Sequence, residues 1–228
     1  MKERPSLKSF LLSKLKQTFA PVKIKRAFME FADRGFVKLG YLPEKMDGLG
    51  KILHISDTPV SMYGYLARTL RRINPSVVVH TGDLADDIKL GLYPAEAGRY
   101  AAAAGRLINI LLAPHRRVLL VLGNHDRADL LPSLPPECSA HEGAVEVNLL
   151  GANFRISHYA EKIMEKPVQY NLFGHDLSSR SFVDGEGRYF LNGIEMMRLI
   201  DPGAEEIKTL VYPRSADSAR MMRANRPK

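Results

Sequence analysis

The chain has 228 residues, of which 45% are hydrophobic and 25% are charged, and this composition excludes a disordered or fibrous protein. The single cysteine, Cys138, excludes an internal disulfide and a zinc site built from several thiolates, so we expect a reducing compartment, with the cytoplasm as the default. The net charge of +8 lies at the two ends: residues 1–46 hold 11 Lys or Arg against 4 Asp or Glu, residues 214–228 hold 5 against 1, and residues 47–213 hold 17 against 20. We therefore divide the chain into a basic helical extension (1–46), one folded domain (47–213) and a basic, disordered tail (214–228).

Residues 6–19 have the spacing of an amphipathic helix, because Leu7, Leu11 and Leu15 recur on one face while lysines lie largely off it. Pro21 ends this helix, and a second, weaker helical pattern follows it. Two interpretations remain open. The extension either packs on the flank of the domain, or forms a basic surface for anionic lipid or nucleic acid, which would place the protein peripherally at a membrane surface.

The next part of the chain alternates between strand and helix patterns. Strands are predicted at 51–57, 76–87 and 117–126, and helices at 60–73 and 94–113. Because strand–helix–strand units at this spacing form right-handed crossovers, these strands are expected to form a parallel sheet.

The second half lacks long helix patterns and reads as a second sheet packed on the first. Its predicted strands are 144–150, 153–157, 168–173, 188–193, 196–200 and 207–212. The fold class is therefore α/β, and the tail after Pro213 is expected to be disordered.

Polar side chains follow five of the predicted strands. They are Asp57, Asp83, Asn124 with His125, His158, and His175. Since ligands of open α/β sheets bind beyond the carboxyl ends of the strands, these side chains are expected to converge. Carboxylates, a carboxamide oxygen and imidazoles form a mixed oxygen and nitrogen site that suits Mn, Fe, Zn or Ni.

The motifs around these residues resemble those of the calcineurin-like metallophosphoesterase superfamily. The family pattern D-x-H, G-D-x-x-[DN], G-N-H-[DE], an isolated His and G-H-x-H is matched here by Asp57-Thr58-Pro59, GDLAD (82–86), GNHD (123–126), His158 and GHDL (174–177). The resemblance implies two mixed β-sheets packed as a sandwich and flanked by helices, in four layers.

Two departures from the family pattern affect the first of its two metal sites. Pro59 and Leu177 stand where the family has histidines, so the first site keeps only Asp57 and the shared Asp83. Asp176 and Asp86 are candidates for replacement oxygen ligands.

The second set of family ligands is complete as Asp83, Asn124, His158 and His175. The resemblance therefore implies one firmly bound divalent ion (Mn, Fe, Zn or Ni) and leaves a second ion open.

The family activity implies a hydrolase that uses metal-activated water to cleave a phosphomonoester or a phosphodiester, that is, a phosphatase or phosphodiesterase. His125 would protonate the departing oxygen, Asp126 would orient the imidazole, and Arg127 would face the substrate anion. The expected substrate is a phosphorylated small molecule or nucleotide. The alternative is a catalytically degenerate member that serves as a scaffold or binds nucleic acid or an anionic surface through its basic ends.

Overall fold

The computed structural model describes residues 46–113, 116–213 and 215–221 of the chain. The helices expected within 1–46 lie outside the described residues, and so does the contact with anionic lipid or nucleic acid predicted for them. Across the described ranges, no helix combines the length and the apolar character that a membrane crossing requires.

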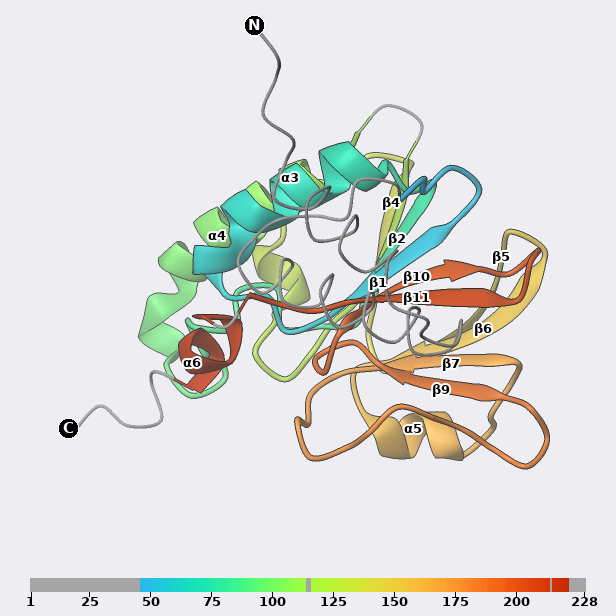
Figure 1. Cartoon of the computed structure of the whole chain (residues 1–228). Helices are drawn as coiled ribbons and strands as arrows, with labels where there is room; N and C mark the ends of the chain where they lie inside the picture. The colour runs from blue at the N-terminus through green and yellow to red at the C-terminus, as the bar shows by residue number, and fades with distance from the viewer. Residues whose placement is uncertain (1–45, 114–115, 214, 222–228) are drawn as a thin grey trace, which may run out of the picture.

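Four layers are stacked in the domain (Figure 1). Helices α3 (Tyr63–Ile73) and α4 (Ala97–Leu111) cover one face of a six-stranded sheet, a five-stranded sheet packs on its other face, and the short helix α5 (Ala160–Met164) covers the far side. The predicted sandwich of two mixed sheets flanked by helices is therefore confirmed.

The strands follow the apolar runs of the sequence. The first sheet has the order β11 (Glu206–Leu210), β10 (Met197–Asp201), β1 (Ile52–Ile55), β2 (Val77–His80), β3 (Arg117–Val121), β4 (Cys138–His141). The second sheet has the order β5 (Ala144–Leu149), β6 (Ala152–Ser157), β7 (Tyr170–Phe173), β9 (Tyr189–Asn192), β8 (Phe182–Val183). Strands β1, β2 and β3 are parallel, as the strand–helix alternation predicts, and β4 adds a fourth parallel strand beside β3.

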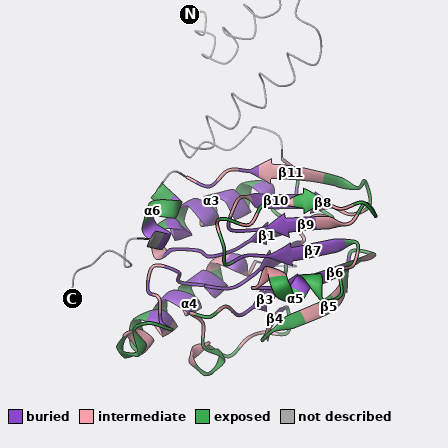
Figure 2. Ribbon diagram, turned by 90° about the horizontal axis from the view of Figure 1, so that it is seen from below, coloured by how far each residue is buried: buried purple, intermediate pink, exposed green. Residues whose placement is uncertain are grey.

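Alternate residues of the central strands pack in two different cores. Val78 and Leu120 contact the layer of helices, whereas Val79 and Leu119 pack against the second sheet. Because every residue of β2 is buried, the strand needs apolar side chains on both faces, which explains its unbroken valine run. Figure 2 shows the same burial along the neighbouring strand β1. These buried strands form the rigid base from which the polar loops emerge.

Two parts of the second half differ from the sequence prediction. Strands β10 and β11 do not join the second sheet, because β10 pairs antiparallel with β1 and so extends the first sheet. Strand β4, which pairs with β3, lies in a stretch whose prolines predict a loop.

The expected disorder of the tail is wrong for its first part, because α6 (Ser215–Met221) is a helix that packs on the domain. Ala216 is fully buried and Arg220 is 4% exposed. The Arg220 guanidinium lies over the ring of Tyr212 and donates to the carbonyl oxygens of Ser56, Asp57 and Ile194. This helix therefore fixes the loop that follows β1.

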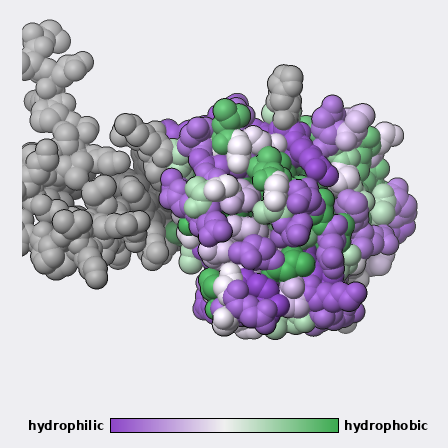
Figure 3. All heavy atoms as spheres, turned by 90° about the vertical axis from the view of Figure 1, so that its right-hand side faces the viewer, coloured by the Kyte–Doolittle hydropathy of each residue, from purple (hydrophilic) through white to green (hydrophobic). Residues whose placement is uncertain are grey.

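The side of the molecule shown in Figure 3 has a mainly hydrophilic surface with hydrophobic residues in small groups. Scattered apolar side chains are ordinary on protein surfaces. The apolar groups on this face therefore need no special explanation.

Candidate metal centre and active site

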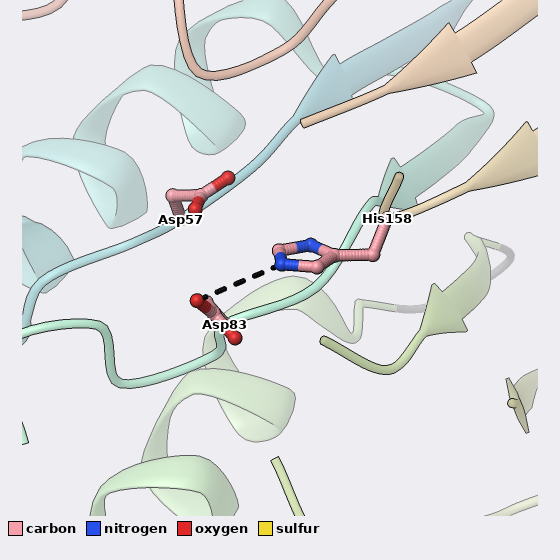
Figure 4. A group of neighbouring side chains, drawn as sticks. All are labelled: Asp57, Asp83 and His158. Atoms are coloured by element: carbon pink, nitrogen blue, oxygen red, sulfur yellow. Dashed lines mark ion pairs between the residues drawn. The ribbon is translucent and has the colours of Figure 1, made fainter. Parts of the chain in front are cut away.

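Three buried ligand residues meet at the carboxyl ends of the strands. Asp57 follows β1, Asp83 follows β2, and His158 follows β6 of the second sheet; one ligand atom from each lies within 4.8 Å of the others. Figure 4 shows the three side chains converging from different strands, with 3.7 Å between His158 Nε2 and Asp83 Oδ2. The site is therefore formed by loops that follow strands of both sheets.

His158 is held in one tautomer. Its Nδ1 lies 2.7 Å from the carbonyl oxygen of Thr81, which can only accept a hydrogen bond, so Nδ1 carries the proton. The lone pair of Nε2 then faces the site, 3.1 Å from Asn124 Oδ1 and 3.1 Å from His175 Nδ1. Ligand atoms of a single ion lie about 3 Å apart when each bond to the ion is roughly 2.1 Å long. This donor set fits a divalent metal ion.

Backbone amides hold the two aspartates in place. The amide of His125 donates to Asp83 Oδ1 at 3.0 Å, and that of His175 donates to Asp57 Oδ2 at 3.1 Å. A side chain at Gly174 would not fit, because its Cβ would lie 2.7 Å from Asp57 Oδ2. The glycine of the GHDL motif is therefore needed for close packing against a metal ligand.

The ligands themselves stand on strained backbone. Asp57, Asp83 and His175 have φ angles of +48°, +57° and +69°, in the left-handed region that residues other than glycine rarely adopt. Strain of this kind is concentrated at functional sites, where the surrounding fold holds it in place. The sequence motifs give no direct sign of this conformation.

The site gathers negative charge that a cation would stabilise. Burial, followed by the charges of Asp57, Asp126 and Asp86, raises the pKa of Asp83 well above its usual range. Burial and the charge of Asp57 likewise raise the pKa of Asp86 to about 6, although Lys89 opposes this shift. A bound divalent ion would reverse the shift at Asp83 by favouring its charged form.

The two candidate replacement ligands for the first metal are both engaged elsewhere. Asp176 is exposed and accepts hydrogen bonds from Ser178 and Ser179. Asp86 is 1% exposed and forms an ion pair with Lys89. The first-metal side is therefore left with Asp57 and the shared Asp83.

His125 stands beside this centre with a free ring nitrogen. Within the described residues, its buried Nδ1 has no hydrogen-bond partner. Burial, followed by the nearby Lys89 ammonium, lowers the pKa of His125 to about 4, so the free imidazole is neutral near pH 7. Binding an anionic substrate beside the ring would raise its pKa and make it a better proton carrier.

Asp126 has a different role from the one expected. Its carboxylate accepts hydrogen bonds from the backbone amides of Gly123, Asp83 and Leu84 and from the hydroxyl of Tyr100, at 2.7 to 2.9 Å. It does not bond to the His125 ring, whose Nδ1 has no partner among the described residues. Asp126 therefore ties together the loops after β2 and β3, and the expected orienting contact with the imidazole is wrong.

Arg127 lies on the surface, where its guanidinium is 52% exposed in an ion pair with Asp129. This ion pair is a surface contact and does not place the guanidinium at the centre. Its role toward a substrate anion stays a prediction.

The fold is that of a metallophosphoesterase. The chain belongs to the calcineurin-like phosphoesterase family, whose sequence model matches residues 50–212. The family depends on divalent metal ions, and Asp57, Asp83 and His158 form a possible site for one here. A comparison with curated proteins gave no match.

Three solved structures are among those similar to this chain. YfcE, a phosphoesterase from E. coli, is 16% identical with a TM-score of 0.44, over 69% of this chain and 96% of that chain. A metallophosphoesterase from Sphaerobacter thermophilus is 14% identical with a TM-score of 0.43, over 81% and 96%. Vps29 from Entamoeba histolytica, complexed with Zn, is 17% identical with a TM-score of 0.41, over 69% and 88%.

Proposed function

We propose that this chain hydrolyses phosphate esters with one divalent metal ion (Mn, Fe, Zn or Ni) held by four side chains. These ligands are Asp83, Asn124, His158 and His175. The observation that supports the proposal is the orientation of His158, whose Nδ1 proton is fixed on Thr81 and whose Nε2 therefore faces the Asn124 and His175 ligand atoms at 3.1 Å. An imidazole nitrogen and a carboxamide oxygen grouped around this lone pair suit a divalent cation.

The ion would supply a Lewis acid for a phosphoryl oxygen and would lower the pKa of a water molecule. The chain's own residues do the rest. His125, adjacent in sequence to the ligand Asn124, would hold a proton for the departing oxygen, and the substrate anion would raise the pKa of its imidazole toward neutrality. Asp126 would hold the loop of Asn124 and His125 against the loop of Asp83, because its carboxylate accepts hydrogen bonds from backbone amides of both loops.

The proposed substrate is a phosphorylated small molecule or a nucleotide, bound as either a monoester or a diester. The loops after β2 and β3 border the centre, and their shape would select between these substrates. Arg127 would reach a substrate anion only by leaving Asp129.

The experiment is to measure the metal content of the purified full chain and then the hydrolysis of p-nitrophenyl phosphate and bis-p-nitrophenyl phosphate with added Mn²⁺. We expect one tightly bound ion and turnover of at least one ester. His125→Gln should lower kcat by about 10²-fold, since general acid catalysis contributes 10²- to 10⁴-fold, while the metal content stays unchanged.

A protein that holds no metal ion and turns over neither ester would overturn the proposal. It would favour the alternative of a degenerate scaffold. Full activity of His125→Gln toward both esters would contradict the role of His125 as proton donor. It would leave the proposed metal-dependent hydrolysis standing.

A further inference from the structure

A lysine is paired with a buried carboxylate beside the centre. Lys89 Nζ forms an ion pair with the Asp86 carboxylate, and the lysine side chain is only 20% exposed. Lys89 has a φ angle of +53°, the same left-handed conformation as Asp57 and Asp83. The loop after β2 therefore adopts an unfavourable backbone conformation at the residue that carries the ammonium group.

Asp86 joins the lysine to the centre. Its backbone amide donates to the carbonyl oxygen of Thr58, the residue after Asp57, and its carboxylate is 1% exposed. The charge of Asp57 acts on Asp86, and the charge of Asp86 acts on Asp83. Three buried carboxylates, those of Asp57, Asp83 and Asp86, therefore lie within electrostatic reach of one another and need positive charge beside them.

The ammonium group also reaches the proton donor. The Lys89 charge is the second cause, after burial, of the lowered pKa of His125. The Cβ of a side chain at Gly91 would lie 2.9 Å from His125 Nδ1, so the loop that carries Lys89 passes directly over the imidazole. Lys89 therefore pairs with the buried Asp86 carboxylate and also acts on the His125 imidazole.

We infer that the Lys89 ammonium, anchored by Asp86, takes the place of the first metal ion, so that the centre works with one metal ion and one side-chain cation. This inference rests on the proposed metal-dependent function. It accounts for Pro59 and Leu177, because a lysine needs no histidine ligands. It also gives Asp86 a role, because the ion pair makes this carboxylate the anchor of Lys89 and not a metal ligand.

The other buried cation nearby, Arg220, does not fill this role. Its nitrogens donate to the carbonyl oxygens of Ser56, Asp57 and Ile194 and to the carboxylate of Asp217. These are contacts to the backbone and to an exposed side chain, not to the ligand carboxylates. The positive charge assigned to the centre is therefore that of Lys89.

The test counts Mn²⁺ ions per full chain by titration calorimetry and records the electron paramagnetic resonance spectrum of the loaded protein. The wild type should bind one ion and give the spectrum of an isolated Mn²⁺. Lys89→Met should bind two ions and give an exchange-coupled spectrum, because Asp57, Asp83 and the released Asp86 then offer three carboxylates to a hard cation. Lys89→Arg keeps the charge and should bind one.

Lys162→Met is the matched control, since Lys162 also pairs with a carboxylate three residues away but lies in α5, outside the centre. It should bind one ion. Where Lys89→Met does not give the circular dichroism spectrum of the wild type, Lys89→Gln replaces it, with the same expected count of two.

The outcomes separate the two proposals. A wild type that binds two ions, or a folded Lys89→Met that still binds one, overturns the role of Lys89 and leaves the proposed hydrolysis standing. A wild type that binds no ion overturns the proposed function and the inference with it.

Discussion

The two sides of the centre are built by different means. On the complete side, candidate ligands come from three separate strand ends: Asn124 Oδ1 and His175 Nδ1 each lie 3.1 Å from His158 Nε2. On the depleted side, Asp57 is supported by Arg220 from α6 and adjoins the Lys89–Asp86 ion pair.

The difference is one of ligand chemistry. The complete side has neutral nitrogen and oxygen donors that suit a transition metal, whereas on the depleted side the Asp86 carboxylate forms an ion pair with Lys89. The proposed role of Lys89 would therefore give the centre a second positive charge while it keeps the ligands for one metal ion.

The largest expected effect comes from removing a ligand of the complete side. His175→Ala should release the metal ion and lower kcat/KM by on the order of 10³-fold, which corresponds to the several kcal/mol that a Lewis acid contributes. Leu177→Ala, two residues further on, is the matched control and should change neither. Equal losses in metal content for both variants would show that metal binding depends on the conformation of this loop and not on the His175 side chain.

The pH dependence of stability tests the first sheet, which supports both sides of the centre. His54 and His80 are buried in the first sheet, and burial lowers the pKa of each to about 3 from an ordinary 6.5. Because the unfolded chain then binds protons more readily, their contribution to stability is present above pH 6.5 and is lost as pH falls toward 3. The unfolding free energy should fall by about 2 kcal/mol per histidine between pH 6.5 and 5.

The measurement is urea unfolding of the metal-free protein at these two pH values, compared with His80→Asn. The variant should lose roughly half of the pH dependence assigned to the two histidines. Any opposing effect of the buried carboxylates is common to both proteins and cancels in the difference. An unchanged pH dependence would contradict the neutral state of His80.

Removing Arg220 tests the support of the depleted side. Arg220→Met leaves the carbonyl oxygens of Ser56, Asp57 and Ile194 without their donor, so the unfolding free energy should fall by about 3 kcal/mol. Arg188→Met removes a half-buried ion pair with Asp184 and should cost less than about 1 kcal/mol. Similar melting temperatures for the two variants would contradict the structural role of α6.

The smallest expected effect restores a missing ligand. Leu177→His in the Lys89→Met background should bind the second Mn²⁺ about tenfold more tightly than Lys89→Met alone, which is the gain of one further ligand bond. Calorimetry gives the affinity directly. Weaker binding would show that position 177 does not face the depleted side.

Sequence patterns predict the parts that depend on local side-chain character. The unbroken apolar residues of β2 and β3 and the polar residues after them indicate both the strands and the site. The position of β10 cannot be predicted in this way, because its pairing with β1 joins residues more than 140 positions apart and has no local signal.

The errors in the site have a similar cause. The expected contact of Asp126 with His125 rests on side-chain chemistry that is visible in a sequence, whereas its true partners are backbone amides that any residue carries. Helix α6 escapes prediction because its buried face consists of two alanines and an arginine, which resemble a solvated segment. Lys89 escapes it because its left-handed backbone has no sequence signature outside glycine.

Helix α6 also sets an order of events during synthesis. The four ligands of the complete side have all left the ribosome once His175 has emerged, but the arginine that fixes the Asp57 backbone emerges 45 residues later (220 − 175). A nascent chain can therefore assemble the metal-binding half before the opposite half is held in place. A ribosome-bound chain stalled between these two points is expected to capture an ion while its Asp57 loop still moves.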